Sequence, residues 1–171
     1  MVKLNIQLRA LRDSDADDIA RLANNKKVWD NVRDKMPYPY ARKDAEFFIG
    51  LTKKEDPQVT FGIIRGDDFC GVIGLILQSD VYRKSAELGY WIGEPYWGMG
   101  IATETVRMIL EYGFKKLDFE RIFASTFEYN FGSMRVLEKN GFVKEGIAKK
   151  EAVKNGVIID VHRYAIVNPK Y

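Results

Sequence analysis

Residues 86–103 read AELGYWIGEPYWGMGIAT, and this stretch connects a predicted strand to a predicted helix. The strand is expected from Tyr82 to Gly93, and the helix from Ile101 to Lys116, where apolar residues recur with helical spacing. Between them, Gly98 and Gly100 allow backbone N–H groups to converge on an anion at the helix N-terminus, where the helix dipole favours negative charge. The stretch therefore predicts a phosphate-binding turn, although a glycine-rich turn that only caps the helix has the same composition.

Two common phosphate-binding motifs do not fit this turn. Gly93 and Gly98 have the spacing of a P-loop, but Met99 and Gly100 stand where that motif requires Lys and then Ser or Thr. Thr103 occupies the last small-residue position of the dinucleotide fingerprint, and the helix follows three predicted antiparallel strands instead of opening the chain. The sequence therefore disfavours both a nucleotide triphosphatase and a dinucleotide-binding unit.

The remaining segments alternate between strand and helix patterns. A strand with alternating apolar residues is expected near the start, and Asn155-Gly156 marks a hairpin between two final strands. The pattern predicts one mixed α/β sheet with helices packed on it. The other expected elements are helices from Ser14 to Asn24, around Trp29–Val32, over Lys43–Lys53 and over Ser133–Lys139, and strands at Val59–Ile63, Phe69–Leu77 and Arg121–Thr126.

Length and composition restrict the class of protein. A chain of 171 residues with 46% hydrophobic residues predicts a single globular domain over residues 1–171. A net charge of +3 is too small to indicate nucleic-acid binding, and one cysteine and one histidine exclude a disulfide framework and a metal site built on His and Cys. The longest apolar run, Val72–Leu77, is far shorter than a membrane span, and no signal-peptide pattern is seen, so a cytoplasmic location is expected.

A second motif follows the strand expected at Arg121–Thr126. Residues 130–142 read NFGSMRVLEKNGF, which places Asn130 and Ser133 in the first turn of a helix that ends at Gly141. Ordinary capping of a helix N-terminus explains this pattern without any ligand.

Together the two motifs resemble those of the GNAT superfamily of acetyl-CoA-dependent N-acetyltransferases, and more closely its Rim-type branch, which includes the ribosomal-protein N-terminal acetyltransferases. The pyrophosphate motif Q/R-x-x-G-x-G/A is matched at residues 97–102, with Trp97 in place of Gln or Arg. Residues 8–15 and 86–92 extend the resemblance over essentially the whole chain. The second family signature is matched by Asn130, Ser133, Glu138, Lys139, Gly141 and Phe142.

The resemblance implies a mostly antiparallel sheet of about seven strands with about four helices, splayed open where the cofactor binds. It implies acetyl-CoA as the acetyl donor and no metal. The residues expected to contact acetyl-CoA are Tyr90, Trp91, Ile92, Trp97, Gly98, Met99, Gly100, Ile101, Ala102, Thr103, Asn130, Ser133 and Arg135.

Acyl transfer to an amine requires a general base and a proton donor for the departing thiolate. Glu87 is the predicted base, acting directly or through a water, because it is a carboxylate within an apolar strand and resembles the base proposed for the branch; an exposed glutamate on the polar strand face is the alternative. Many family members use a tyrosine as the acid, but Leu137 stands at that position, so Ser133 is the predicted substitute and Tyr129 a weaker one.

The acceptor is less well defined by the sequence. The resemblance places the acceptor groove near Trp29, Tyr38 and Tyr40, although these aromatic residues fit a local core equally well. A protein N-terminal α-amine is the preferred acceptor, with a small amine such as a polyamine, amino acid or aminoglycoside as the alternative. A catalytically silent acetyl-CoA-binding module is a third reading, motivated by Trp97 and Leu137. No nucleic acid or membrane partner is expected, and both a monomer and a homodimer fit.

Overall fold

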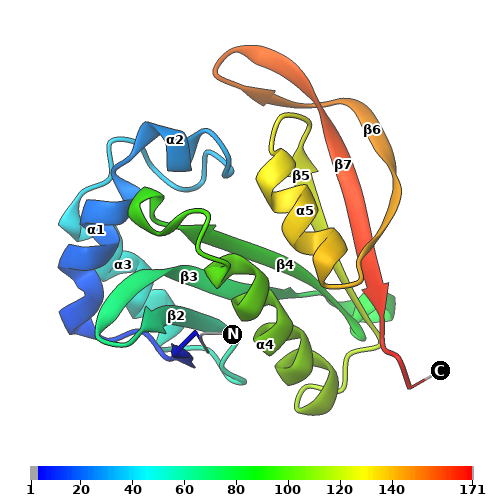
Figure 1. Cartoon of the computed structure of the whole chain (residues 1–171), viewed down its shortest axis with the longest axis horizontal. Helices are drawn as coiled ribbons and strands as arrows, with labels where there is room; N and C mark the ends of the chain where they lie inside the picture. Colours follow the sequence, from blue (N-terminus) through cyan, green and yellow to red (C-terminus); the bar gives the residue numbers. More distant parts are fainter. Residues whose placement is uncertain (1–3, 171) are drawn as a thin grey trace. The chain divides into compact units, whose positions relative to one another are not determined.

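The computed structural model describes residues 4–170, which form a mixed α/β fold (Figure 1). Its α-helices are α1 (Ala16–Ala23), α2 (Lys26–Trp29), α3 (Arg42–Thr52), α4 (Ile101–Lys115) and α5 (Phe131–Lys139), and its 3-10 helices are η1 (Asp13–Asp15), η2 (Asp80–Tyr82) and η3 (Glu94–Tyr96). Its strands are β1 (Ile6–Arg9), β2 (Thr60–Arg65), β3 (Asp68–Leu77), β4 (Ser85–Ile92), β5 (Arg121–Phe127), β6 (Val143–Lys154) and β7 (Val157–Val167).

The seven strands form one sheet in the order β1-β2-β3-β4-β5-β7-β6. β1–β2, β2–β3, β5–β7 and β6–β7 pair antiparallel, whereas β4 and β5 pair parallel over Ser85–Glu87 and Arg121–Phe123. The predicted fold class is therefore confirmed: the described residues form five α-helices, and the resemblance implied about four.

The start of α2 is set by a cap at Asn25. The prediction placed a helical turn around Trp29–Val32, but α2 begins earlier, at Lys26. The side chain of Asn25 accepts a hydrogen bond from the Lys27 backbone N–H at 2.9 Å, which satisfies one of the N–H groups that a helix start leaves without a partner.

Contacts divide the chain into two compact units. Unit 1 extends to Gly74 and includes Tyr90–Thr105; unit 2 comprises Leu75–Gly89 and the chain from Val106 onward. The prediction of a single domain over the whole chain stays a prediction. No helix within residues 4–170 combines the length and the apolar composition needed to cross a bilayer.

The core of unit 1 is made where helices α1 and α3 bury apolar side chains. Ile19 of α1, Ile49 of α3 and Val72 of β3 belong to one buried cluster, with exposed fractions of 5% or less. Gly71 of β3 permits a close backbone approach, because a Cβ there would lie 2.2 Å from the carbonyl oxygen of Trp91 in β4. Glycine at this position therefore fits β3 against the last residues of β4.

An ion pair holds the start of unit 1. The carboxylate of Asp15, which is only 4% exposed, accepts hydrogen bonds from Arg9 Nη1, from Arg9 Nη2 and from the Arg12 backbone N–H, each at 2.8 Å. Burial by itself raises the pKa of this carboxyl group, but the hydrogen bonds and charges outweigh it and hold the pKa of Asp15 below its usual value.

In unit 2, strand β5 has two chemically different faces. Ile122 and Ala124 are buried, whereas the alternating residues Arg121, Phe123 and Ser125 are only partly buried. A Cβ at Gly113 of α4 would lie 2.8 Å from Ile122 Cδ1, so α4 packs on the Ile122 face. Because side chains alternate along a strand, Arg121, Phe123 and Ser125 lie on the opposite face.

Candidate active site

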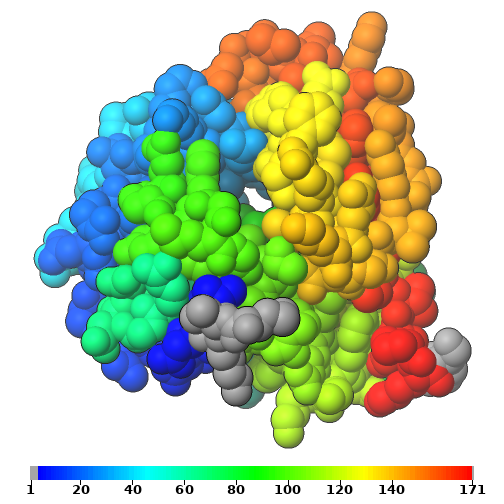
Figure 2. Space-filling model, in the orientation of Figure 1, coloured from blue at the N-terminus to red at the C-terminus, as the bar shows by residue number. Residues whose placement is uncertain are grey.

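The turn that was predicted to bind phosphate lies in unit 1, between η3 and the start of α4. Gly98 and Gly100 have φ values of 74° and 77°, a left-handed conformation that glycine adopts without strain. Helix α4 begins at Ile101, as the spacing of its apolar residues indicated. Residues 97–100 are exposed, and Figure 2 shows the green segment that contains them at the surface. A glycine turn that leads into a helix N-terminus is a suitable site for an anion.

Trp97 contributes to the shape of this turn and adds no charge. Its indole Nε1 donates a hydrogen bond to the carbonyl oxygen of Ile92 at 2.7 Å, which ties the turn to the end of β4. The polar atom of the Trp97 side chain is thus used within the protein.

Arg65 brings a cation to the same turn, and the sequence analysis missed it. Its Nη1 lies 2.9 Å from Met99 Sδ, and its Cζ lies 5.4 Å from the centroid of the Tyr96 ring. Asp68 Oδ2 is 3.3 Å from Nη2 of the same guanidinium. As the last residue of a plain β-strand, Arg65 carries no local motif that would have identified it.

The residues preceding the turn are anchored by polar contacts. Glu94 in η3 accepts a hydrogen bond from Lys27 Nζ at 2.5 Å and one from Asn25 Nδ2 at 2.7 Å. The hydrogen bond from Lys27 is the main cause that lowers the pKa of Glu94. These contacts hold η3 beside α2, so the turn starts from a fixed position within unit 1.

The aromatic residues predicted for the acceptor separate into two groups. Trp29 and Tyr38 form a ring pair with centroids 5.6 Å apart, and Trp29 Nε1 donates to the carbonyl oxygen of Met36 at 2.8 Å. Tyr40 belongs to the core of unit 1, with an exposed fraction of 8%, and burial raises its pKa to about 12. The structure therefore brings Trp29 and Tyr38 together and places Tyr40 in the apolar cluster.

The second motif begins α5 in unit 2. The Oδ1 atom of Asn130 accepts a hydrogen bond from the backbone N–H of Ser133 at 3.1 Å, so Asn130 caps the helix. Ser133 is partly buried and Arg135 is exposed. Leu137 has no exposed surface. The helix starts at Phe131, two residues earlier than expected, because the cap is Asn130.

The predicted base, Glu87, is partly buried on β4. It alternates with the buried residues Ala86 and Leu88, and its partner in the parallel ladder is Phe123 of β5. Residues two apart on a strand share a face, so Glu87 lies on the same face as Ser85. The three strand residues that follow Gly89 lie in unit 1, where Tyr90 and Trp91 are partly buried and Ile92 is 7% exposed.

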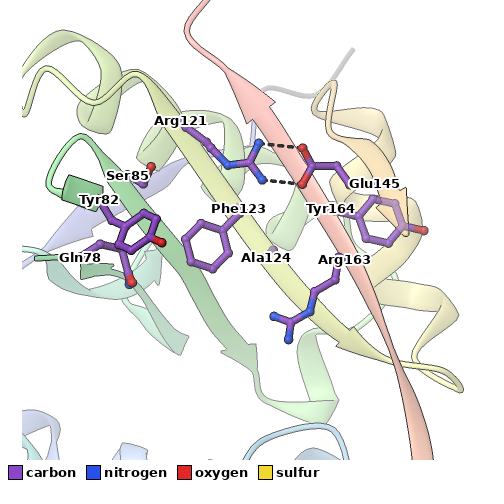
Figure 3. Close-up of a pocket in the computed structure, with 9 residues that line it drawn as sticks. All are labelled: Gln78, Tyr82, Ser85, Arg121, Phe123, Ala124, Glu145, Arg163 and Tyr164. Carbon is purple, nitrogen blue, oxygen red and sulfur yellow. Dashed lines mark hydrogen bonds and ion pairs between the residues drawn. The ribbon is translucent and has the colours of Figure 1, made fainter. Parts of the chain in front are cut away.

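Unit 2 also contains a cavity of about 510 Å³ (Figure 3). None of the residues predicted above to be catalytic, to contact acetyl-CoA or to bind the acceptor lines it. The residues that line it come from separate segments of the chain, so no local sequence motif predicts the cavity. The lining residues are Gln78, Tyr82, Ser85, Arg121, Phe123, Ala124, Glu145, Arg163 and Tyr164.

Two arginines define the electrostatics of this cavity. Arg121 forms a two-pronged ion pair with Glu145, with Nη1 and Oε1 2.7 Å apart, and this contact raises the pKa of Arg121 and lowers that of Glu145. Arg163 donates from Nη1 to Ser125 Oγ at 2.8 Å and from Nη2 to Glu151. In the view of Figure 3, the guanidinium group of Arg121 lies above the Phe123 ring and that of Arg163 lies below it.

Comparisons with known proteins agree with the motifs. The acetyltransferase (GNAT) domain family matches residues 5–143. A probable N-acetyltransferase, YjcK of Bacillus subtilis (strain 168), is 41% identical over 119 residues, and the match covers 68% of this chain and 65% of the relative, just under two thirds of its length. The ribosomal protein uS5-alanine N-acetyltransferase of Escherichia coli (strain K12) is 30% identical, over 96% of this chain and 88% of that protein.

A solved acetyltransferase structure also resembles this chain. A spermidine N-acetyltransferase from Vibrio cholerae, in complex with CoA and spermine, is 26% identical, with a TM-score of 0.84 and coverage of 98% of both chains. The fold and the two motifs define an acetyl-CoA-dependent acyltransferase class. The chain belongs to the GNAT acetyltransferase family.

Proposed function

We propose that this protein transfers the acetyl group of acetyl-CoA directly to an amine in one ternary complex, and that the preferred acceptor is a protein N-terminal α-amine. The observation that carries the proposal is the left-handed glycine turn at the start of α4, within a chain that matches the GNAT domain over residues 5–143. The likeness to a ribosomal-protein N-acetyltransferase supports the choice of acceptor.

The turn has the chemistry that a pyrophosphate needs. Backbone N–H groups from Gly98 to Thr103 and the dipole of α4 would hold the two phosphates, and Arg65 beside Met99 would add one positive charge. Tyr90, Trp91 and Ile92 would pair with the amide-bearing arm of the cofactor. Asn130, Ser133 and Arg135 would contact it from α5.

The chemical step needs a proton acceptor and a proton donor. Glu87 would take a proton from the acceptor ammonium, directly or through a water, to give the neutral amine that attacks. The amine nitrogen then forms a bond to the acetyl carbon and the carbon–sulfur bond breaks. Ser133 would give its proton to the departing thiolate and take back the second proton of the former amine nitrogen. A backbone N–H near Trp91 would stabilise the negative charge that develops on the acetyl oxygen. Asn130 would position Ser133, since its Oδ1 accepts from the Ser133 N–H.

Mass spectrometry of acceptors after incubation with acetyl-CoA tests the proposal. A mixture of free N-terminal peptides, a panel of polyamines, amino acids and aminoglycosides, and a sample without acceptor should be compared, with Glu87→Gln in parallel. The proposal expects acetylated peptide N-termini with the wild type and at least about a hundredfold less with Glu87→Gln. Acetylation of polyamines alone would support the small-amine alternative, which the likeness to a spermidine N-acetyltransferase favours. CoA binding with no product from any acceptor would indicate a silent binding domain.

A further inference from the structure

The cavity of unit 2 lies on the same sheet face as the proposed base. Glu87 pairs with Phe123, and Arg163 pairs with Ser125. Partners in a ladder share a face, and so do residues two apart on one strand. The chain of pairs therefore places Glu87, Phe123, Ser125 and Arg163 on one face, opposite to the face that α4 covers.

The strand pairing also gives the approximate distance between Glu87 and Arg163. From Glu87 to Arg163 the path crosses two strand spacings and advances two residues, so their Cα atoms are about 12 Å apart. Successive Cα atoms of a peptide are about 3.8 Å apart. With its amine at Glu87, a bound peptide would bring the side chain of its second or third residue to Arg163.

The guanidinium groups of the cavity are the charged donors available to a ligand, and each is also paired with a carboxylate, Arg121 with Glu145 and Arg163 with Glu151. Glu145 is the one carboxylate among the lining residues, and Arg121 already engages both of its oxygens. A guanidinium has five N–H donors, and the contacts of Arg163 with described residues use two of them, towards Ser125 and Glu151. Arg163 therefore keeps donor capacity for a carboxylate.

We propose that this cavity selects acceptors with a carboxylate close to the reacting amine, and that the preferred substrates are N-terminal peptides with an acidic second or third residue. This inference rests on the proposed function. Arg163 binds the acidic side chain through charge-assisted hydrogen bonds, and the ring of Phe123 provides an apolar floor beside it. Polyamines are disfavoured, because the one carboxylate among the lining residues, Glu145, is already paired with Arg121 and offers a second ammonium group no open partner.

Two hexapeptides with free N-termini and amidated C-termini test the inference. They are identical except for Asp or Asn at the second position, and spermidine is the third acceptor. Thiol release from acetyl-CoA should give kcat/KM at least about tenfold higher for the Asp peptide than for the Asn peptide, and lowest for spermidine. In Arg163→Gln the ratio between the peptides should fall to about one.

Two further variants control for folding and charge. Arg163→Lys keeps the charge and should retain part of the Asp preference, and Arg42→Gln, which removes an arginine paired with Asp17 and Glu46, should retain all of it. Equal kcat/KM for the two peptides in the wild type would overturn the inference and leave the proposed function standing. Acetylation of spermidine in preference to both peptides would overturn the inference as well.

A binding measurement tests the ligand preference of the cavity independently of acetyl transfer. Fluorescence anisotropy of the same peptides, labelled at the C-terminus, should show at least about tenfold tighter binding of the Asp peptide to CoA-loaded protein and loss of the difference in Arg163→Gln. If no acceptor releases thiol, the proposed function fails. Equal binding of the two peptides, or no binding of either, would then overturn the inference also.

Discussion

Replacement of Gly98 by alanine tests whether the conformation of the turn is required for acetyl-CoA. The φ of Gly98 is 74°, and a Cβ at this position would meet no atom within 4 Å. The cost is therefore conformational and not steric, about 1–2 kcal/mol for an L-residue in the left-handed region. If the turn escapes this cost by leaving the left-handed conformation, CoA binding should weaken by about 5- to 30-fold.

Gly156 offers a matched control in the turn between β6 and β7. Its φ is 75°, and a Cβ there would also meet nothing within 4 Å. Gly156→Ala, whose turn keeps the left-handed conformation, should lower the melting temperature by roughly 2–8 °C, and Gly98→Ala should lower it less, because its turn relaxes. Isothermal titration calorimetry with CoA should show weaker binding only for Gly98→Ala. Equal CoA affinity in the two variants would refute the role assigned to the turn.

Three further substitutions test the role of Arg65 in CoA binding and the contributions of Gly71 and Asp15 to stability. Arg65→Gln should raise the Kd for CoA about 3- to 10-fold in calorimetry, and an unchanged Kd would remove Arg65 from the site. Gly71→Ala should destabilise the protein by about 2–3 kcal/mol, because its Cβ would lie 2.2 Å from the oxygen of Trp91; a melting temperature within about 1 °C of the wild type would contradict this. Asp15 has a lowered pKa in the folded state, so its contribution is present above the unfolded pKa of about 3.9 and is lost as the pH falls through the folded pKa. Asp15→Asn should cost about 2–3 kcal/mol at pH 7, from the lost interaction with Arg9, and urea titrations should show a smaller further loss below pH 4 than in the wild type.

The elements around both motifs were predictable because their signals are local. The helix from Ile101 follows from the spacing of its apolar residues, and the left-handed turn before it follows from Gly98 and Gly100.

The cavity and Arg65 were not predictable for a physical reason. Arg121 and Arg163 are far apart in the sequence and come together only through the pairing of β5 with β7. The alternation along residues 121–127 could have placed Arg121 and Phe123 on one face, but it gives no indication of what faces them. Arg65 reaches the turn through Met99, a contact between segments 34 residues apart.

The central claim is acetyl transfer to an amine with Glu87 as the base. The most direct measurement is thiol release from acetyl-CoA, followed together with the acetylated amine by mass spectrometry, with and without a free N-terminal peptide. Thiol release should depend on the peptide, with one acetylated N-terminus for each thiol, and both signals should be lost in Glu87→Gln. Thiol release that is independent of any amine, or release that Glu87→Gln leaves unchanged, would contradict it.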